Sequence, residues 1–401
     1  MRLLITEEAL HTGVGHWPSY IGGLVDGFRS SGDEVDVLAH QEATDEVLER
    51  VSGIPWFSRN CWIDRKSQGA LGGLLHNFRF LSELNSWLTN KDSYDWICAL
   101  TMRLQHLLAF ALLSRKRNIP PNTRFLLLFV QGFGQFDGPG KPPVFPKTHS
   151  NRLARLCFRL LAPAVISKRV MIAAETQGMQ KELQSFTGLP VALFPHPVPS
   201  PPTKTRLAVR SSVTITCPGF ARHEKGNDLL QAATLRLRGE AGYEDIRFIC
   251  QWPEAFKMPD GTMLEPDPIL LKDPRIEFLN ELLDAAEYEA LLARSDIIVQ
   301  PYRIKSYHHR VSRVAIEAAS RGIPLVYMEN TWSEEVASLV GTGVAIHKET
   351  PDSVMGALQE ALGRLPELQK EAKAGAEKVA SYHSHGQFRQ ILVKSTMRRP
   401  I

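Results

Sequence analysis

The sequence predicts an α/β protein with two domains, each built on a doubly wound parallel sheet. Three observations lead to this prediction. The chain has 401 residues, which is long enough for two cores of ordinary size. Short apolar runs alternate with amphipathic segments from one end of the chain to the other. A proline-rich stretch, PHPVPSPPTK at 195–204, interrupts this alternation near the middle, and the alternation restarts after it.

The first half alternates as expected for a parallel sheet, in which a helix connects successive strands. The apolar runs that predict strands are 2–6, 35–39, 96–100, 125–130, 170–174 and 191–194. The segments that predict helices are 18–31, 68–88, 103–117 and 152–167. We expect a loop at 55–66 and a second loop, rich in proline and glycine, at 132–147.

The prolines at 195–204 fix the backbone and remove hydrogen-bond donors, so this stretch is predicted to be a linker. In the second half, strands are predicted at 213–217, 246–250, 275–279, 296–300, 325–328 and 344–346. Helices are predicted at 227–238, 285–293 and 314–321, and the basic end of the chain, 366–401, is also predicted to be helical. Two such domains are expected to leave a cleft between the carboxyl ends of their sheets, where ligands of these folds bind.

Composition excludes several classes of protein. The 47 Lys and Arg residues nearly balance the 43 acids, which argues against a dedicated nucleic-acid binder. The five cysteines have no Cys-x-x-Cys spacing, so we expect buried, reduced thiols in a cytoplasmic protein. The sequence shows no signal peptide and no apolar run long enough to span a bilayer. Seven basic residues and no acid lie at 138–174, which indicates either contact with an anionic membrane surface or a solvated helix face.

The stretch 302–332 contains the clearest candidate for an anion site. Ser312 is a good helix N-cap, and the helix that it begins should end at Gly322. A loop rich in basic and aromatic residues precedes this helix, whose positive N-terminus favours a phosphate group. Glu317, one turn inside the helix, suits a pair of sugar hydroxyls such as those of ribose. The alternative is an ordinary solvated loop and a solvated glutamate.

Five segments resemble GT-B fold glycosyltransferases, and most closely the retaining enzymes of family 4. These segments are GGLVDGFRSSGDEVDVLAH, MIAAETQGMQKELQSFTGLPVALFPHPV, CPGFARHEKGNDLLQAA, RIEFLNELLDAAEYEALLARSDIIVQPY and IEAASRGIPLV. Each segment alone is weak evidence, but five in the same order over nearly the whole chain are specific. The resemblance implies an acceptor-binding domain at 1–198, a nucleotide-sugar-binding domain at 199–375 and a helical segment at 376–401 that crosses back to the first domain.

The resemblance implies that a sugar is transferred from a nucleoside diphosphate donor to an acceptor hydroxyl with retention at the anomeric carbon. The leaving phosphate would accept the proton of the acceptor in a front-face attack. The acceptor is expected to be a carbohydrate or a lipid-linked sugar in cell-surface polysaccharide or glycolipid synthesis, at the cytoplasmic side of a membrane. We expect no cofactor and no metal, because no Asp-x-Asp pair stands at a strand end and His308–His309 lacks zinc-ligand spacing.

The resemblance also suggests roles for individual residues. Arg222 and Lys225 match the pair that stabilises the departing diphosphate, as fixed cations do for developing negative charge. Glu317 matches the glutamate that holds the ribose, Leu283 lies where the backbone meets the nucleobase, and Gly13 and Gly15 match the loop that approaches the donor. Further donor contacts are expected from His309, Arg310, Ser312 and Arg313, and His16 and Trp17 are candidates to stack on the acceptor.

Three positions depart from the family pattern. His309 stands where the family has a first glutamate, Arg313 where it often has glycine, and Gln131 where many relatives have histidine after the strand at 125–130. Gln131 can still bond a sugar, although it cannot transfer a proton as histidine does. Two alternatives therefore remain: a non-catalytic GT-B binding or scaffold protein, and a sugar-nucleotide epimerase of the same fold.

Overall fold

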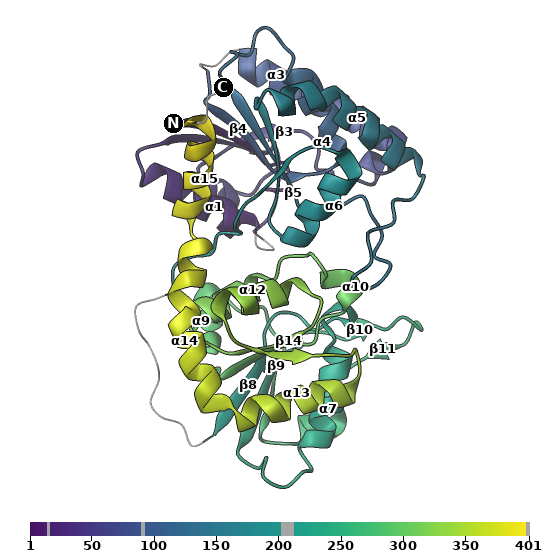
Figure 1. Ribbon diagram of the computed structural model, residues 1–401, viewed down its shortest axis with the longest axis vertical. Coiled ribbons are helices and arrows are strands. Elements are labelled where there is room, and N and C mark those ends of the chain that lie inside the picture. The colour runs from purple at the N-terminus through teal and green to yellow at the C-terminus, as the bar shows by residue number, and fades with distance from the viewer. Residues whose placement is uncertain (14–16, 90–92, 202–211, 398–401) are drawn as a thin grey trace. The chain divides into compact units, whose positions relative to one another are not determined.

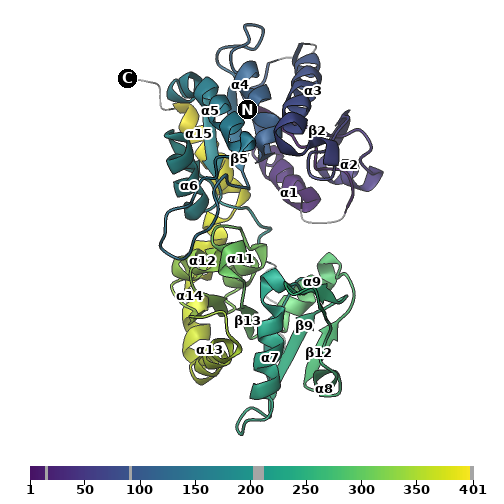
Figure 2. The same cartoon turned by 90° about the vertical axis from the view of Figure 1, so that its right-hand side faces the viewer.

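The computed structural model describes residues 1–13, 17–89, 93–201 and 212–397, and the chain divides into two compact units. Unit 1 comprises Met1–Pro197 together with Ser384–Ile401, and unit 2 comprises Val198–His383. Each unit is an α/β structure with helices on both faces of a central sheet (Figures 1 and 2).

Unit 1 contains a seven-stranded sheet in the order β3-β2-β1-β4-β5-β6-β7, and every pair of neighbouring strands is parallel. The strands are β1 (Arg2–Thr6), β2 (Glu34–His40), β3 (Gly53–Phe57), β4 (Trp96–Met102), β5 (Arg124–Phe129), β6 (Val170–Ala174) and β7 (Val191–Leu193). The sequence reverses direction across the sheet between β1 and β4, so this pair is the topological switch point. The doubly wound parallel sheet is confirmed.

Helices cover both faces of the sheet in unit 1. They are α1 (Trp17–Arg29), α2 (Asp45–Val51), α3 (Gly69–Thr89), α4 (Leu104–Leu113), α5 (His149–Ile166), α6 (Gln177–Thr187) and α15 (His385–Met397). Alternate strand residues enter two separate apolar clusters: Leu4 packs with α3 to α6, whereas Leu3 and Ile5 pack with α1, α2 and α15. This alternation is what a strand buried on both faces requires.

The last helix, α15, completes unit 1 although the whole of unit 2 precedes it in sequence. Its Phe388 ring lies 4.8 Å from the Phe194 ring and 6.3 Å from the Phe28 ring. Arg389 Nε donates a 2.6 Å hydrogen bond to Asp33, whose side chain is only 1% exposed. Apolar packing and a largely buried ion pair therefore hold α15 against the first part of the chain.

Unit 2 contains a six-stranded parallel sheet in the order β12-β9-β8-β13-β14-β15. The strands are β8 (Val213–Cys217), β9 (Ile246–Gln251), β12 (Ile276–Leu279), β13 (Ile297–Gln300), β14 (Leu325–Met328) and β15 (Val344–Ile346). A short antiparallel hairpin, β10 (Phe256–Lys257) with β11 (Met263–Leu264), stands beside it. Here the switch point lies between β8 and β13.

The helices of unit 2 include several that the sequence pattern did not predict. The unit contains α7 (Asn227–Leu237), α8 (Pro268–Leu271), α9 (Ala285–Ala293), α10 (Ile304–Tyr307), α11 (Arg313–Ser320), α12 (Trp332–Val340), α13 (Pro351–Gly363) and α14 (Leu365–Tyr382). Unit 2 has two main apolar clusters, one on each face of its sheet. One cluster contains residues of α7 and α13, and the other contains residues of α9, α11 and α12. In unit 1, β3 begins before the segment 55–66 and occupies part of it, so the prediction of a loop there was partly wrong.

Candidate functional site

The loops that follow β8 and β13 meet at the switch point of unit 2. Ligands of doubly wound sheets bind at the carboxyl ends of the strands on either side of such a point. The contact between the two loops is close: a Cβ atom on Gly226 would lie 1.9 Å from the carbonyl oxygen of Pro301. Gly226 also has a φ of +68°, so only glycine fits this position without strain.

Three cations lie on these two loops. Arg310 donates a 3.1 Å hydrogen bond to Glu224, and Arg222 lies 3.8 Å from the same carboxylate. Burial lowers the pKa of Lys225, and the positive charges of Arg222 and Arg310 lower it further. Arg310 lies 85 positions after Lys225 in the sequence, and the structure brings it close to Lys225 and Arg222. In the part of the chain that the structure describes, Glu224 is the one acid paired with Arg222 and Arg310, so the loops concentrate positive charge for an anionic ligand.

Two buried amides that sequence reasoning missed hold the first loop in place. Asn227 Oδ1 accepts a 3.0 Å hydrogen bond from the backbone N–H of Arg222. Gln251 Oε1 accepts a 2.8 Å bond from the N–H of Gly219, while its Nε2 donates to the carbonyl of Glu281. Leu283, which is expected to meet the nucleobase, follows Glu281 by two residues. Gln251 therefore joins the segment around Leu283 to the loop after β8, which carries Arg222 and Lys225. The signal in the sequence was a glutamine directly after the apolar residues Phe248, Ile249 and Cys250.

The N-terminus of α11 lies at the same edge. Ser312 accepts a 3.4 Å bond from the N–H of Ala315, which is the cap that the sequence predicted. Gln300, at the end of β13, donates a 2.9 Å bond to the Ser312 hydroxyl and accepts a 2.7 Å bond from Ser333. Gln300 therefore fixes the start of α11 relative to the sheet, and the helix dipole adds positive potential there.

Glu317 lies one turn inside α11 and is buried. Its Oε1 accepts a 2.6 Å bond from Arg313 Nε, and its Oε2 accepts a 2.8 Å bond from the Tyr288 hydroxyl. A carboxylate can accept about four hydrogen bonds, so two further bonds to a ribose remain chemically possible. The structure thus gives Arg313 a defined partner, namely the glutamate expected to hold the ribose.

His309 is a neutral imidazole in this arrangement. Burial lowers the pKa of His309 to about 3, and the charge of the neighbouring His308 contributes to the shift. A neutral ring can donate one hydrogen bond and accept one, whereas the glutamate found in the family carries a negative charge. His309 therefore differs from that glutamate in charge as well as in shape.

Unit 1 has a second polar site at its own switch point. The Thr101 hydroxyl of β4 donates a 2.8 Å bond to Oε1 of Glu7, which directly follows β1. Glu7 is fully buried, and its Oε2 has no partner among the residues that the structure describes. Burial raises the pKa of Glu7 to about 8, so its carboxyl group holds a proton at neutral pH. No pattern in the sequence marks this residue beyond its place after a strand.

The remaining expected residues of unit 1 lie around the same carboxyl edge. Gly13 belongs to the loop after β1, Trp17 begins α1, and Gln131 is an exposed residue just after β5. The Trp17 ring packs edge-on against Tyr20 at 5.8 Å, so it has an aromatic partner within unit 1. Gly15 and His16 lie outside the described residues. The acceptor and donor roles of all these residues stay predictions.

No protein-family model matches the chain, and a search of curated proteins gives no match. Solved structures do match over nearly its full length. A glycosyltransferase from Rickettsia africae has a TM-score of 0.65 at 12% identity, covering 98% of this chain and 97% of the other. The HepE protein of Anabaena in complex with UDP has a TM-score of 0.65 at 14% identity, covering 98% and 99%.

A third match is a Listeria monocytogenes protein assigned as a UDP-N-acetylglucosamine 2-epimerase, with a TM-score of 0.56 at 15% identity over 100% and 98% of the two chains. At such low identity these likenesses show the fold alone. Together with the two all-parallel sheets, they establish the two-domain, Rossmann-like GT-B fold that the sequence predicted.

Proposed function

We propose that the chain is a glycosyltransferase that takes a sugar from a nucleoside diphosphate donor, and that unit 2 binds this donor. The observation that carries the proposal is the group of cations, Arg222, Lys225 and Arg310, beside the N-terminus of α11 at the switch point. A diphosphate leaving group gains negative charge in the transition state, and preorganised cations stabilise that charge. HepE of Anabaena, which shares the fold, has been solved with UDP and with UDP-glucose.

Each residue of unit 2 then has a distinct role. Arg222 and Lys225 contact the diphosphate, while Arg310 and the N-terminus of α11 beginning after Ser312 add positive potential. Glu317 holds the ribose, and Arg313 orients its carboxylate through the 2.6 Å bond. The backbone at Leu283 contacts the nucleobase, and His309 bonds the donor sugar as a neutral ring. In this proposal the positive charges of these side chains stabilise the diphosphate, so that no metal ion is needed at the site.

The acceptor side of the proposal rests on unit 1 and on the sequence resemblance. Gln131 would form a hydrogen bond with an acceptor hydroxyl, and Trp17 would stack on a sugar ring of the acceptor. The backbone at Gly13 and Gly15 would lie close to the donor. We place the chain with the retaining enzymes of family 4, acting in cell-surface polysaccharide or glycolipid synthesis.

Exposed Arg152, Leu156 and Arg159 on α5 suit peripheral contact with an anionic membrane that carries the acceptor. No helix among the described residues is long and apolar enough to cross a bilayer.

The epimerase is the second candidate, because a protein assigned to that activity shares the fold over the whole chain. The two activities give different products from UDP-N-acetylglucosamine. An epimerase inverts the configuration at C2 of the sugar. A transferase without an acceptor hydrolyses the donor slowly and releases small amounts of UDP. A non-catalytic binding protein would bind the nucleotide and yield neither product.

The direct experiment is calorimetric titration with UDP, UDP-glucose and UDP-N-acetylglucosamine, followed by chromatography of the products. We expect Lys225→Ala and Arg222→Ala each to weaken UDP binding by about tenfold or more, because each removes a charge-assisted contact. Lys272→Ala and Arg247→Ala are matched controls, since both side chains are exposed in unit 2 and lie outside the candidate loops. Equal affinity for the Lys225→Ala, Arg222→Ala and wild-type proteins would contradict the proposal.

A further inference from the structure

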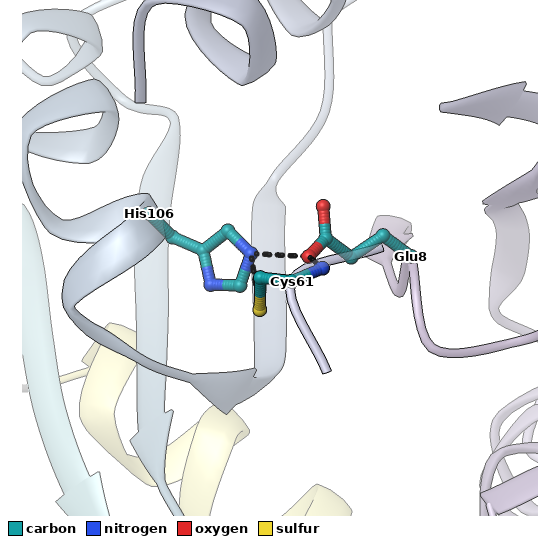
Figure 3. Close-up of side chains that lie close together, drawn as sticks. All are labelled: Glu8, Cys61 and His106. Carbon is teal, nitrogen blue, oxygen red and sulfur yellow. Dashed lines mark hydrogen bonds and ion pairs between the residues drawn. The ribbon is translucent and has the colours of Figure 1, made fainter. Parts of the chain in front are cut away.

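A buried group of metal-ligating side chains lies in unit 1, separate from the donor site of unit 2. Figure 3 shows Glu8, Cys61 and His106: a ring nitrogen of His106 faces one oxygen of Glu8, and the sulfur of Cys61 lies beside the ring. They come from three segments: the loop after β1, the loop after β3 and the first turn of α4. All three are buried, with exposures of 2% for Glu8, 0% for Cys61 and 3% for His106.

The spacing of the ligand atoms is close to that of a zinc site. His106 Nε2 lies 3.2 Å from Glu8 Oε1 and 3.8 Å from Cys61 Sγ, and the three ligand atoms all lie within 4.8 Å of one another. In a tetrahedral zinc site the bond lengths place a nitrogen and an oxygen ligand about 3.3 Å apart, and a nitrogen and a sulfur ligand about 3.5 Å apart. The two distances from His106 Nε2 therefore lie within a few tenths of an ångström of these values, and the three side chains leave the fourth position of the tetrahedron to a further ligand such as water.

We propose that Glu8, Cys61 and His106 bind a zinc ion through Glu8 Oε1, Cys61 Sγ and His106 Nε2. The ligand set selects the metal class. A thiolate and an imidazole favour Zn²⁺ over Mg²⁺ and Ca²⁺, which prefer oxygen ligands only. Zinc binding displaces the thiol proton of Cys61 to solvent, and His106 then carries its proton on Nδ1.

His76 supports this site from the other side of the carboxylate. Its Nε2 lies 2.9 Å from Glu8 Oε2, and its Nδ1 lies 2.9 Å from the Ser67 hydroxyl. The backbone N–H of Cys61 also donates a 2.6 Å bond to Glu8 Oε1. Ligating carboxylates are commonly held in this way by hydrogen bonds from a second layer of residues, which fix the orientation of the ligand.

Charge also favours a cation between these side chains. A buried carboxylate is costly unless it is paired, and a buried thiolate is costly for the same reason. The two positive charges of Zn²⁺ match one carboxylate and one thiolate, while His106 binds as a neutral ring. Hydrogen bonds to Glu8 explain why His76 and His106 face its carboxylate. The Cys61 sulfur makes only a weak 3.8 Å contact with His106 Nε2, which a metal ion bound to both atoms would replace.

The ion would join three segments at the carboxyl edge of the unit 1 sheet. Glu8 directly follows Glu7, the residue at the switch point, His106 lies after β4, which pairs with β1, and Cys61 lies after β3, at the edge of the sheet. Residues 7–13 after β1 and 58–64 after β3 contain no helix or strand, so a metal crosslink would restrict these segments to one arrangement. We therefore assign the zinc ion a structural role. The proposal of a zinc site does not depend on the proposal of a donor site in unit 2.

Metal content tests the proposal directly. Full-length protein purified without chelator should contain about one zinc per chain by elemental mass spectrometry, because the three side chains form a single site. Cys61→Ser should lose most of this zinc, whereas Cys157→Ser should keep it, because Cys157 is an equally buried cysteine on α5 away from the cluster. Zinc at background levels in the wild type, or full zinc content in Cys61→Ser, would overturn the proposal.

A second measurement needs no variant and so avoids any folding defect. Metal-free wild-type protein titrated with Co²⁺ should develop the intense near-ultraviolet absorption of a cobalt–thiolate bond, saturating at about one equivalent. Competition with Zn²⁺ should abolish the band. Cobalt bound without this absorption would exclude Cys61 as a ligand and would also overturn the proposal. Neither readout depends on nucleotide binding.

Discussion

The backbone N–H of Gly219 donates a 2.8 Å hydrogen bond to Gln251 Oε1, which joins the loop after β8 to the end of β9. Gly219 has a φ of +83°, and a Cβ atom on it would lie 2.5 Å from Lys225 Nζ. The bond therefore holds the backbone in a conformation that leaves room for the lysine. The position of a candidate catalytic cation depends on a glutamine that itself carries no charge.

Gln251→Leu should weaken UDP binding about three- to tenfold, because the N–H of Gly219 loses its partner and the loop that carries Lys225 shifts. Calorimetric titration measures this effect. Gln231→Leu is the matched control, since Gln231 on α7 also makes two hydrogen bonds to loop backbone but lies outside the candidate loops. Both variants should lose about 1 kcal/mol of stability, and only Gln251→Leu should lose affinity. Equal affinities would remove Gln251 from the site.

Nucleotide affinity should fall as the pH rises on the alkaline side. Burial, with the charges of Arg222 and Arg310, lowers the pKa of Lys225 in the free protein. A bound diphosphate favours the charged amine and raises that pKa again, so the complex binds more protons than the free protein does. Affinity is therefore lost as pH rises through the pKa of the free protein, by at most about tenfold per pH unit.

The control for this pH dependence is Lys225→Met, which keeps the length of the side chain without the charge. Its affinity should be low and should no longer fall at alkaline pH. Titrations in buffers of different ionisation enthalpy report proton uptake directly. A wild-type protein that takes up no proton on binding UDP would show that Lys225 is remote from the diphosphate.

The role of Glu317 can be tested by removing hydroxyl groups from the ligand. We expect wild-type protein to bind the 2′,3′-dideoxy analogue of UDP about tenfold less tightly than UDP, because a hydrogen bond to a charged group contributes about 1.5 kcal/mol or more. Glu317→Ala should bind the two ligands equally. A preference for UDP that survives in Glu317→Ala would assign the ribose to another residue.

Gly226→Ala should disrupt unit 2 locally and abolish nucleotide binding. The added methyl group would meet the carbonyl of Pro301 at a φ that disfavours alanine, so a loss of about 2–4 kcal/mol is expected. Gly242→Ala is the matched control: its φ of +90° imposes the same strain, but nothing lies within 4 Å of the new methyl group. Chemical denaturation should show the larger loss for Gly226→Ala, and comparable losses would contradict the close loop contact.

The ion pair between Asp33 and Arg389 should make stability depend on pH in the acid range. Burial raises the pKa of Asp33, but Arg389 and the Met1 ammonium lower it more, so the net shift is downward. A depressed pKa contributes stability that is present above the ordinary pKa of aspartate and is lost as pH falls through the pKa of the folded protein. Asp33→Asn should therefore lose about 2 kcal/mol at neutral pH and little in acid.

Asp352→Asn is the control for this prediction, because the ion pair of Asp352 with Arg236 is exposed on both sides. It should change stability by less than about 1 kcal/mol. Denaturant titrations at neutral and acid pH measure both variants. Should the two variants behave alike, α15 would be held by its apolar contacts alone.

Most of the fold could be predicted because apolar runs at strand length are a local signal. β1, β6, β8 and β14 begin and end where the sequence predicted, since each run is bounded by polar or turn-forming residues. β3 was missed because GIPWF contains a glycine and a proline, which are typical of loops. In α13, a proline start and an internal glycine concealed a helix that is stabilised mainly by burial of one face.

The donor site could be predicted in part because its residues follow strands that are adjacent at a switch point. Arg222, Lys225 and Ser312 belong to recognisable local patterns, and the structure brings their two loops together. The bond from Tyr288 to Glu317 spans 29 positions, and that from Thr101 to Glu7 spans 94, so no local pattern reveals either. Cys61 was expected to be buried, which is confirmed, but its position beside His106 follows only from the packing of α4.

The contribution of α15 to unit 1 also bears on how the protein is made. Translation releases residues 1–197 from the ribosome well before residues 384–401, which complete the same unit. During that interval the rings of Phe28 and Phe194 lack Phe388, so an incomplete product exposes an apolar surface that chaperones or proteases can bind. A stop codon just before the codon for Ser384 would therefore damage the core of unit 1 and leave the residues of unit 2 complete.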